Sequence, residues 1–271
     1  DDLYTELLES GSKKGGPLSA STVRHCYVVL SAAFTFGERR GEIDRNPVRA
    51  SRPPRKPRAP IIMPTRGEVL DMLDNVEGPA WREAVLRLGV ASGSRRGELL
   101  GIRWSDIDYE SSTVRRRFSV TISSQGVGVR EGSKTGVGLP PLTIDEPTAV
   151  ALRRLQRAQK ESALAAGVSL VDDPWLFAAA EWPDGSRVMS PEVVKSWWAR
   201  FRRKHPQLAG VQWKNLRNYV ITQSLAAGVD PFTVARRAGH RDATMIMRHY
   251  AQYLPAADQA AAEAMSRVNT R

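Results

Sequence analysis

Apolar residues recur at helical spacing in the first 48 residues of the chain. They stand three or four positions apart and are Val23, Tyr27, Leu30, Ala33 and Phe36. This period is typical of the buried face of a helix. Residues 19–22 read Ser-Ala-Ser-Thr and offer side chains that can cap a helix N-terminus. We therefore expect one helix that starts there and ends near Gly37 or Gly41, before Asn46-Pro47 breaks the chain.

From residue 65 onward, the pattern predicts further helices around a short region of strands. Thr65 and Glu68 have the spacing of a capping box, which favours a helix start at this point. The expected helices cover residues 66–75, 80–92, 145–165, 190–203, 214–228, 231–238, 242–252 and 256–267. Between residues 112 and 144, strand-forming residues are punctuated by glycines, which indicates short strands and turns. The expected fold is mainly α with a small antiparallel β-sheet, and no internal repeat is visible.

Residues 50–64 lie between these two regions and contain five prolines with basic residues among them. The basic residues are Arg52, Arg55, Lys56 and Arg58. Prolines make such a stretch extended and semi-rigid, and its cations suit a path along a phosphate backbone. An ordinary solvated linker can have the same composition, so both interpretations stay open. We expect a first domain over residues 1–49, a basic linker over 50–64 and a second domain over 65–271.

Charge narrows the choice of partner. The chain of 271 residues has 40 Lys and Arg against 29 Asp and Glu, a formal net charge of +11. This excess favours polyanions, with nucleic acid first and an anionic membrane surface second, although a basic protein without such a partner also has it. The single cysteine excludes a disulfide framework, and four histidines argue against a His-rich metal centre. No apolar run approaches about 18 residues and no signal peptide is visible, so we expect a cytoplasmic protein.

An arginine pair stands at a predicted helix junction. Residues 93–100 read GSRRGELL, so an apolar helix ends at Gly93, two arginines follow, and a second short helix begins. Glu98 lies three residues beyond Arg95 and could cap the new helix or orient the guanidinium. Taken alone, an Arg-x-x-Glu pair is usually a surface ion pair.

Three further motifs follow in the second half of the chain. They are WKNLRNY at 213–219, AGHRD at 238–242 and MRHYA at 247–251. Together with the arginine pair, in this order and at this spacing, they resemble the active-site motifs of the tyrosine recombinase (phage integrase) family. The resemblance is strongest over residues 91–108 and 214–265, where Tyr250 follows His240 by ten residues as in the family pattern. Residues 19–48 resemble the end of the family's helical core-binding domain, and we expect the first helices of that domain to be absent here or reduced to residues 2–10.

The resemblance implies cleavage of DNA without a metal or other cofactor. Arg95 and Arg217 would clamp the non-bridging oxygens of a phosphate, because a guanidinium fork can make two bonds to it. His240 would supply another donor. Tyr250 would attack phosphorus to give a 3′-phosphotyrosyl link, and Lys134 in a GSKTG turn would protonate the leaving 5′-oxygen. The link conserves the phosphodiester energy, so religation would need no ATP.

The sequence departs from the family pattern in three places. Lys214 stands where histidine is usual, and Asn218 follows Arg217 where histidine is frequent. Lysine can donate to a phosphate oxygen but serves less readily as a base at neutral pH, so the route by which Tyr250 loses its proton stays open. Residues 137–141 read VGLPP and replace the arginine-containing strand that commonly follows the lysine turn.

Several of these residues also have a structural interpretation. His240 could be a histidine at a helix end, Lys134 a solvated turn lysine and Tyr250 a core aromatic. Tyr253 shares a helical face with Tyr250 and is the competing nucleophile, although the ten-residue spacing favours Tyr250. No regular basic–aromatic interleaving supports base stacking, so four tryptophans are interpreted as packing residues: Trp104, Trp197, Trp198 and Trp213.

The resemblance further implies a site-specific recombinase or integrase that acts on double-stranded DNA as a homotetramer. Such a protein would be bacterial or phage-encoded, would have no membrane partner, and could need an accessory DNA-bending protein. Arg24 and Arg241 join the linker cations as expected DNA contacts. Two other functions stay open: a catalytically weakened DNA-binding or architectural protein, and a type IB topoisomerase. The Ala-rich tail over residues 255–265 could pack on its own domain or dock on a neighbouring protomer.

Overall fold

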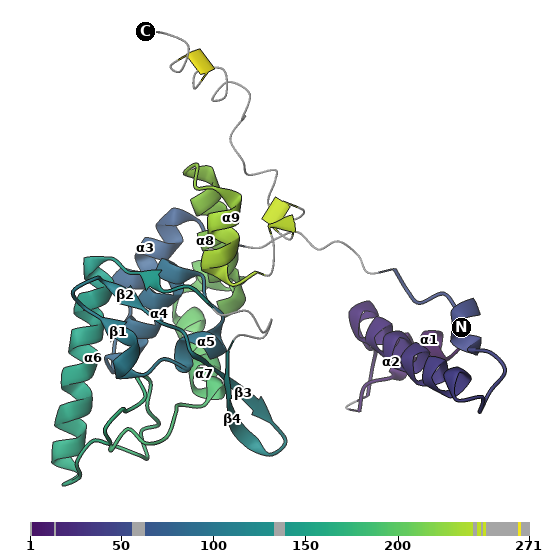
Figure 1. Cartoon of the computed structure of the whole chain (residues 1–271), viewed down its shortest axis with the longest axis horizontal. Helices are drawn as coiled ribbons and strands as arrows, with labels where there is room; N and C mark the ends of the chain where they lie inside the picture. The colour runs from purple at the N-terminus through teal and green to yellow at the C-terminus, as the bar shows by residue number, and fades with distance from the viewer. Residues whose placement is uncertain are drawn as a thin grey trace. The chain divides into compact units, whose positions relative to one another are not determined.

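The computed structural model divides the chain into two compact units, residues 1–60 and 61–271 (Figure 1). It describes residues 2–13, 15–55, 63–132, 139–240, 243–244, 246–247 and 265–266. Within these ranges, no helix is long and apolar enough to cross a membrane.

The first unit consists of two helices and one short 3₁₀ turn. Its elements are α1 (Asp2–Ser10), α2 (Ala20–Arg39) and η1 (Pro47–Ala50). Ser19 caps α2, as the sequence predicts, because its hydroxyl accepts from the backbone N–H of Thr22 at 3.2 Å. The helix continues through Gly37 and ends just before Gly41. A right-handed helix cannot include Gly41, because its φ is 72°. Asn46 is buried and caps η1, which marks the predicted break at Asn46-Pro47.

The second unit contains the helices that the periodicity predicts, within one to two residues for most of their ends. They are α3 (Arg66–Asp74), α4 (Trp81–Ser92), α6 (Glu146–Ala165), α7 (Pro191–Lys204), α8 (Trp213–Ala226) and α9 (Pro231–Ala238). The unit also contains α5 (Arg96–Leu100), the short helix expected after the arginine pair, and the 3₁₀ turns η2 (Trp104–Asp106) and η3 (Pro206–Leu208). The capping box at α3 is confirmed: the Thr65 N–H donates to the Glu68 carboxylate and the Glu68 N–H donates to the Thr65 hydroxyl. The two helices predicted beyond residue 241 lie almost wholly outside the described residues.

The predicted strands form two small antiparallel sheets. Strands β1 (Ile107–Asp108), β2 (Thr113–Val114) and β5 (Leu142–Thr143) form a sheet in the order β1-β2-β5. Strands β3 (Phe118–Ser123) and β4 (Gly126–Glu131) form a hairpin that projects from the helical body beside α5 (Figure 1). The expected fold, mainly α with a small antiparallel β component, is confirmed.

Helix α4 lies at the centre of this unit and contacts α3, α5, α6 and α8. Its residues Ala84, Val85, Leu86 and Leu88 are fully buried in the main core. Trp197 and Trp198 of α7 are also buried there, and the partly buried Trp104 and Trp213 pack against this core. The packing interpretation of these four tryptophans is confirmed. A second, smaller core joins α8 to α9 through side chains such as Ile221. The site described next therefore rests on α4, α5, α8 and α9, which these two cores hold.

Candidate functional site

Arg95 stands at the junction between α4 and α5. Helix α4 ends at Gly93, whose φ of 61° is a left-handed conformation that suits glycine, and Arg95 then occupies the N-cap of α5. The Glu98 carboxylate is only 1% exposed and accepts from both the backbone N–H of Arg95 at 2.9 Å and its Nη1 at 2.7 Å. The pair is therefore not a surface ion pair. Glu98 caps the helix and orients the guanidinium at the same time.

Arg217 and Lys214 approach the same junction from α8. Arg217 Nη1 donates to the carbonyl oxygen of Gly93 at 2.9 Å, while Lys214 is exposed one turn earlier on the helix. Together with Arg95 they line a pocket of about 520 Å³. The remaining lining residues are Ser94, Arg96, Lys195, Trp198, Ala199, Arg202, Gln212 and Trp213. Six of these eleven side chains are cationic and none is acidic, so the pocket suits an anion.

His240 reaches this region through the C-terminus of α9. The helix ends at Gly239, whose φ is 69°, and the N–H of His240 turns back to the carbonyl oxygen of Ala235 at 2.9 Å. Arg95 Nη1 donates to the carbonyl oxygen of Gly239 at 3.3 Å. The structure thus brings four of the predicted residues into one region, since three line the pocket and His240 follows a residue that Arg95 contacts.

Two arginines that the sequence did not single out lie beside this group. Arg116 is 3% exposed and donates to the Ser94 hydroxyl at 2.9 Å, the Arg237 carbonyl at 3.0 Å and the Pro140 carbonyl at 3.1 Å. Burial lowers its pKa to about 10, with the nearby charge of Glu98 acting in the opposite direction. Burial also lowers the pKa of Arg237. In the sequence, Arg116 stands between Arg115 and Arg117, and nothing in this run of arginines distinguishes the buried Arg116 from its two exposed neighbours.

The other predicted residues divide into two groups. Lys134, Arg241 and Tyr250 lie outside the described residues, as do Lys56 and Arg58 of the linker. The first unit carries Arg24, Arg52 and Arg55, all exposed, and Arg24 Nη1 donates to the carbonyl oxygen of Pro54 at 3.3 Å. Within the part of the chain that the structure describes, no group of three potential metal ligands gathers.

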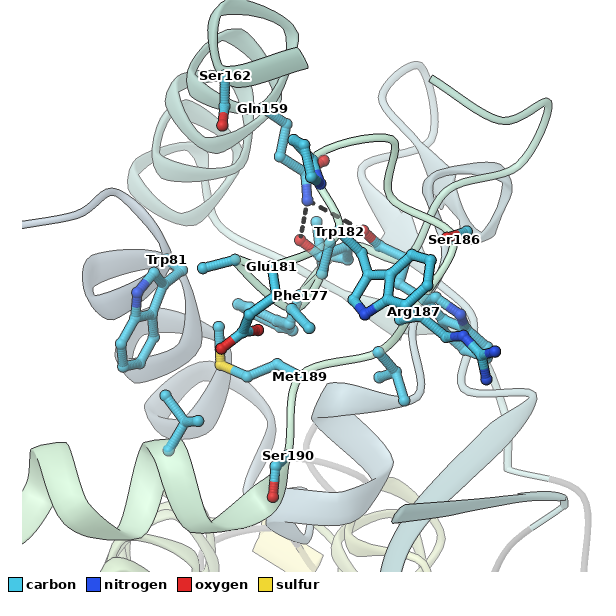
Figure 2. A pocket seen from close by; sticks show the side chains of 18 of the residues that line it. Trp81, Gln159, Ser162, Phe177, Glu181, Trp182, Ser186, Arg187, Met189 and Ser190 are labelled. Carbon is cyan, nitrogen blue, oxygen red and sulfur yellow. Dashed lines mark hydrogen bonds between the residues drawn. The ribbon is translucent and has the colours of Figure 1, made fainter. Parts of the chain in front are cut away.

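A larger cavity, of about 910 Å³, lies between α6, α7 and residues 175–190 (Figure 2). Its wall is largely apolar and includes Trp81 and Phe177. Gln159 fixes part of the wall, because its Nε2 donates to the carbonyl oxygens of Trp175 and Leu176, each at 3.0 Å. None of the predicted site residues lines this cavity, so it does not belong to the candidate site.

Comparison with known protein families shows the family of this chain. Residues 65–256, which include every motif of the candidate site, match the model of the phage integrase family. The chain belongs to the phage integrase family.

Individual relatives of this integrase-family chain are distant. IntQ of Escherichia coli K12, described as a defective protein, is 24% identical over 254 residues, which are 87% of this chain and 61% of IntQ. A XerC-like tyrosine recombinase of Caldanaerobacter subterraneus subsp. tengcongensis is 22% identical over 269 residues, which are 93% of this chain and 66% of that protein. The chain spans less than two thirds of the length of either relative.

The fold of the chain is also found in a solved integrase. The Tn1549 transposon integrase, in complex with transposon right-end DNA, superposes with a TM-score of 0.73 at 21% identity. The similarity covers 93% of this chain and 81% of that chain. The mainly α fold with its small antiparallel sheet is therefore an integrase fold.

Proposed function

We propose that this chain is a site-specific DNA recombinase that breaks and rejoins duplex DNA through a 3′-phosphotyrosyl intermediate. The cationic pocket of Arg95, Lys214 and Arg217 carries the proposal, because these side chains come from segments more than a hundred residues apart and no acidic side chain is among the residues that line the pocket. A phosphodiester is the anion that such fixed donors stabilise best as charge develops on its non-bridging oxygens. Membership of the phage integrase family supports the same function.

In the proposed reaction, the phenol of Tyr250 gives its proton to water, its phenolate oxygen attacks the scissile phosphorus, and the bond from phosphorus to the 5′-oxygen breaks. Arg95 and Arg217 hold the non-bridging oxygens, and Lys134 gives its proton to the leaving 5′-oxygen, which becomes a free hydroxyl. Rejoining is the reverse step. A 5′-hydroxyl from another strand attacks the phosphotyrosine, its proton returns to Lys134, and Tyr250 leaves.

The phenol of Tyr250 needs help to ionise, since the ordinary pKa of tyrosine is about 10. Nearby positive charge favours the phenolate, and we propose that the six cations of the pocket supply this charge. We assign Lys214 to charge stabilisation, because a lysine ammonium is a compact point charge and this one is exposed at the pocket. His240 is assigned as a further donor to the phosphate.

Double-stranded DNA is the proposed substrate, and a homotetramer on two duplexes is the proposed assembly. The formal charge of +11 supports binding to the phosphate backbone. In the first unit, exposed Arg24, Arg52 and Arg55 are proposed backbone contacts. For Lys56, Arg58 and Arg241, and for an accessory DNA-bending protein, the assignment rests on the sequence alone.

A nicked suicide substrate tests the proposal. Nicked duplexes that tile the DNA flanking the coding sequence are incubated with the protein, with a label on the 5′ side of the break. We expect a covalent adduct that retains this label, since the tyrosine holds the 3′-phosphate. Tight and specific binding to one duplex without any adduct would instead support the DNA-binding protein without catalysis. Relaxation of supercoiled DNA that lacks any such site would support a type IB topoisomerase.

A further inference from the structure

Two arginine side chains fix the C-terminal end of α9. One comes from outside the helix and bonds to its backbone, and the other belongs to the helix and bonds to neighbouring segments. The side chain of Arg116 donates to the backbone carbonyl of Arg237 at 3.0 Å. In turn, Arg237 Nη2 donates to the carbonyl oxygens of Ala91 at 2.8 Å and Thr143 at 2.9 Å. We call Arg116 and Arg237 the arginine clamp. It ties the end of α9 to the end of α4 and to strand β5.

The clamp acts within a few residues of His240 and Arg95. From Arg237 the chain makes one tight turn through Gly239 to His240, so a shift of the end of α9 moves the imidazole with it. On the other side, Arg116 donates to the hydroxyl of Ser94, the residue before Arg95, at 2.9 Å. The same side chain therefore reaches the backbone segments that carry both groups.

The chemistry of the clamp favours a role in geometry over one in stability. Among the described residues, the acceptors of the Arg116 side chain are neutral and no carboxylate bonds to it. A guanidinium that is 3% exposed in such surroundings is costly to bury. Burial is accordingly the main reason that the pKa of Arg116 falls to about 10. Packing alone would be served by an apolar side chain. The planar fork of arginine instead lets one side chain reach acceptors in three separate segments.

We infer that Arg116 and Arg237 are positioning residues, which set the place of His240 relative to Arg95 for attack on the DNA phosphate. The inference rests on the proposed function for the roles of His240 and Arg95. It adds to that function two residues whose side chains connect the segments that carry His240 and Arg95.

The test uses Arg237, which is half-buried, with its neighbour Arg236 as the matched control. Arg236 is exposed on the same helical turn, so Arg236→Met removes the same charge without touching the clamp. For Arg237→Met we expect the single-turnover cleavage rate at saturating DNA to fall about 10- to 100-fold, while Kd changes by less than about 3-fold. Arg237→Lys keeps one donor group and should recover part of the rate. Arg236→Met should cleave at the wild-type rate.

A double-mutant cycle separates positioning from general damage. If Arg237 acts through His240, Arg237→Met should lower the single-turnover cleavage rate by less than about 2-fold when His240 is already replaced by alanine. The inference would be overturned if Arg237→Met lowered the cleavage rate equally with and without His240, or if it weakened only the binding of DNA. Arg116→Lys provides a second, milder variant if Arg237→Met fails to fold by circular dichroism.

Hydrogen exchange keeps the inference testable even if the proposed function fails. If wild-type protein forms no adduct, the recombinase proposal falls, whereas the clamp still predicts exchange rates. The Gly239 and His240 amides bond back to the last turn of α9, so Arg237→Met should speed their exchange about 10-fold over Arg236→Met. Equal exchange in the two variants would show that the clamp does not hold this turn.

Discussion

Replacing Glu98 with glutamine should destabilise the second unit, because it removes the negative charge that accepts hydrogen bonds from Arg95. Glu98 is 1% exposed and accepts two hydrogen bonds from Arg95, at 2.7 Å and 2.9 Å. Glutamine has the same shape, but its amide nitrogen must face one of the two Arg95 donors. Glu98→Gln therefore loses one bond and weakens another.

The magnitude follows from these contacts. A hydrogen bond to a charged group contributes about 1.5–3 kcal/mol, but the Arg95 side chain is 33% exposed and solvent screens its share. We expect the free energy of unfolding to fall by about 2 kcal/mol, which for a unit of this size lowers Tm by roughly 4–8 °C. The substitution also removes the negative charge of Glu98, which favours the charged form of the buried Arg116.

Thermal and urea denaturation with and without sulfate measure both parts of this prediction. We expect sulfate to bind the cationic pocket of the native protein and to replace some of the lost negative charge, so it should raise the Tm of Glu98→Gln more than that of wild type. Glu146→Gln is the control, because Glu146 pairs with Arg153 at 2.9 Å on the surface, where an ion pair contributes about 0–1 kcal/mol. Two results would show that the Glu98 charge does not stabilise the second unit. One is a free energy of unfolding for Glu98→Gln within about 0.5 kcal/mol of wild type, and the other is a sulfate-induced rise in Tm equal to that of Glu146→Gln.

Three further changes test the local geometry. Gly239→Ala should destabilise by about 1–3 kcal/mol more than Gly228→Ala in urea denaturation: both positions have left-handed φ, but only at Gly239 would the new Cβ meet a side chain, 2.6 Å from Leu139. Equal costs would contradict the predicted clash. Asn46→Ala removes three hydrogen bonds of a buried side chain, so amides of α2 should exchange about 10-fold faster, and unchanged exchange would count against this role. Thr65→Ala should cost about 1 kcal/mol through loss of the capping box, and no change in urea midpoint would show that the cap contributes nothing.

Local patterns predicted the helices well because their signals are local. The cap at Ser19, the capping box at Thr65 and the glycine ends at Gly93 and Gly239 each act within one helical turn. Residue propensity and hydrophobic periodicity are therefore enough to predict where such helices begin and end. The order of the motifs likewise predicted that residues near 95, 214, 217 and 240 would gather.

Contacts between distant segments could not be predicted in the same way. Arg116 stands in a run of three arginines that looks solvated, yet its acceptors at Ser94, Pro140 and Arg237 come from segments 22, 24 and 121 residues away. The burial of Glu98 has the same origin, because an Arg-x-x-Glu pair has no sequence mark that distinguishes it from a surface pair. Only the packing of α5 in the core makes that distinction.

Tyr250 is the proposed nucleophile, and a comparison of two tyrosine variants tests this assignment. Wild type, Tyr250→Phe and Tyr253→Phe are incubated with the nicked duplex that gives the adduct, and covalent protein–DNA complexes are counted on a denaturing gel. We predict that the adduct disappears in Tyr250→Phe and persists in Tyr253→Phe. An adduct that persists in Tyr250→Phe would contradict the account.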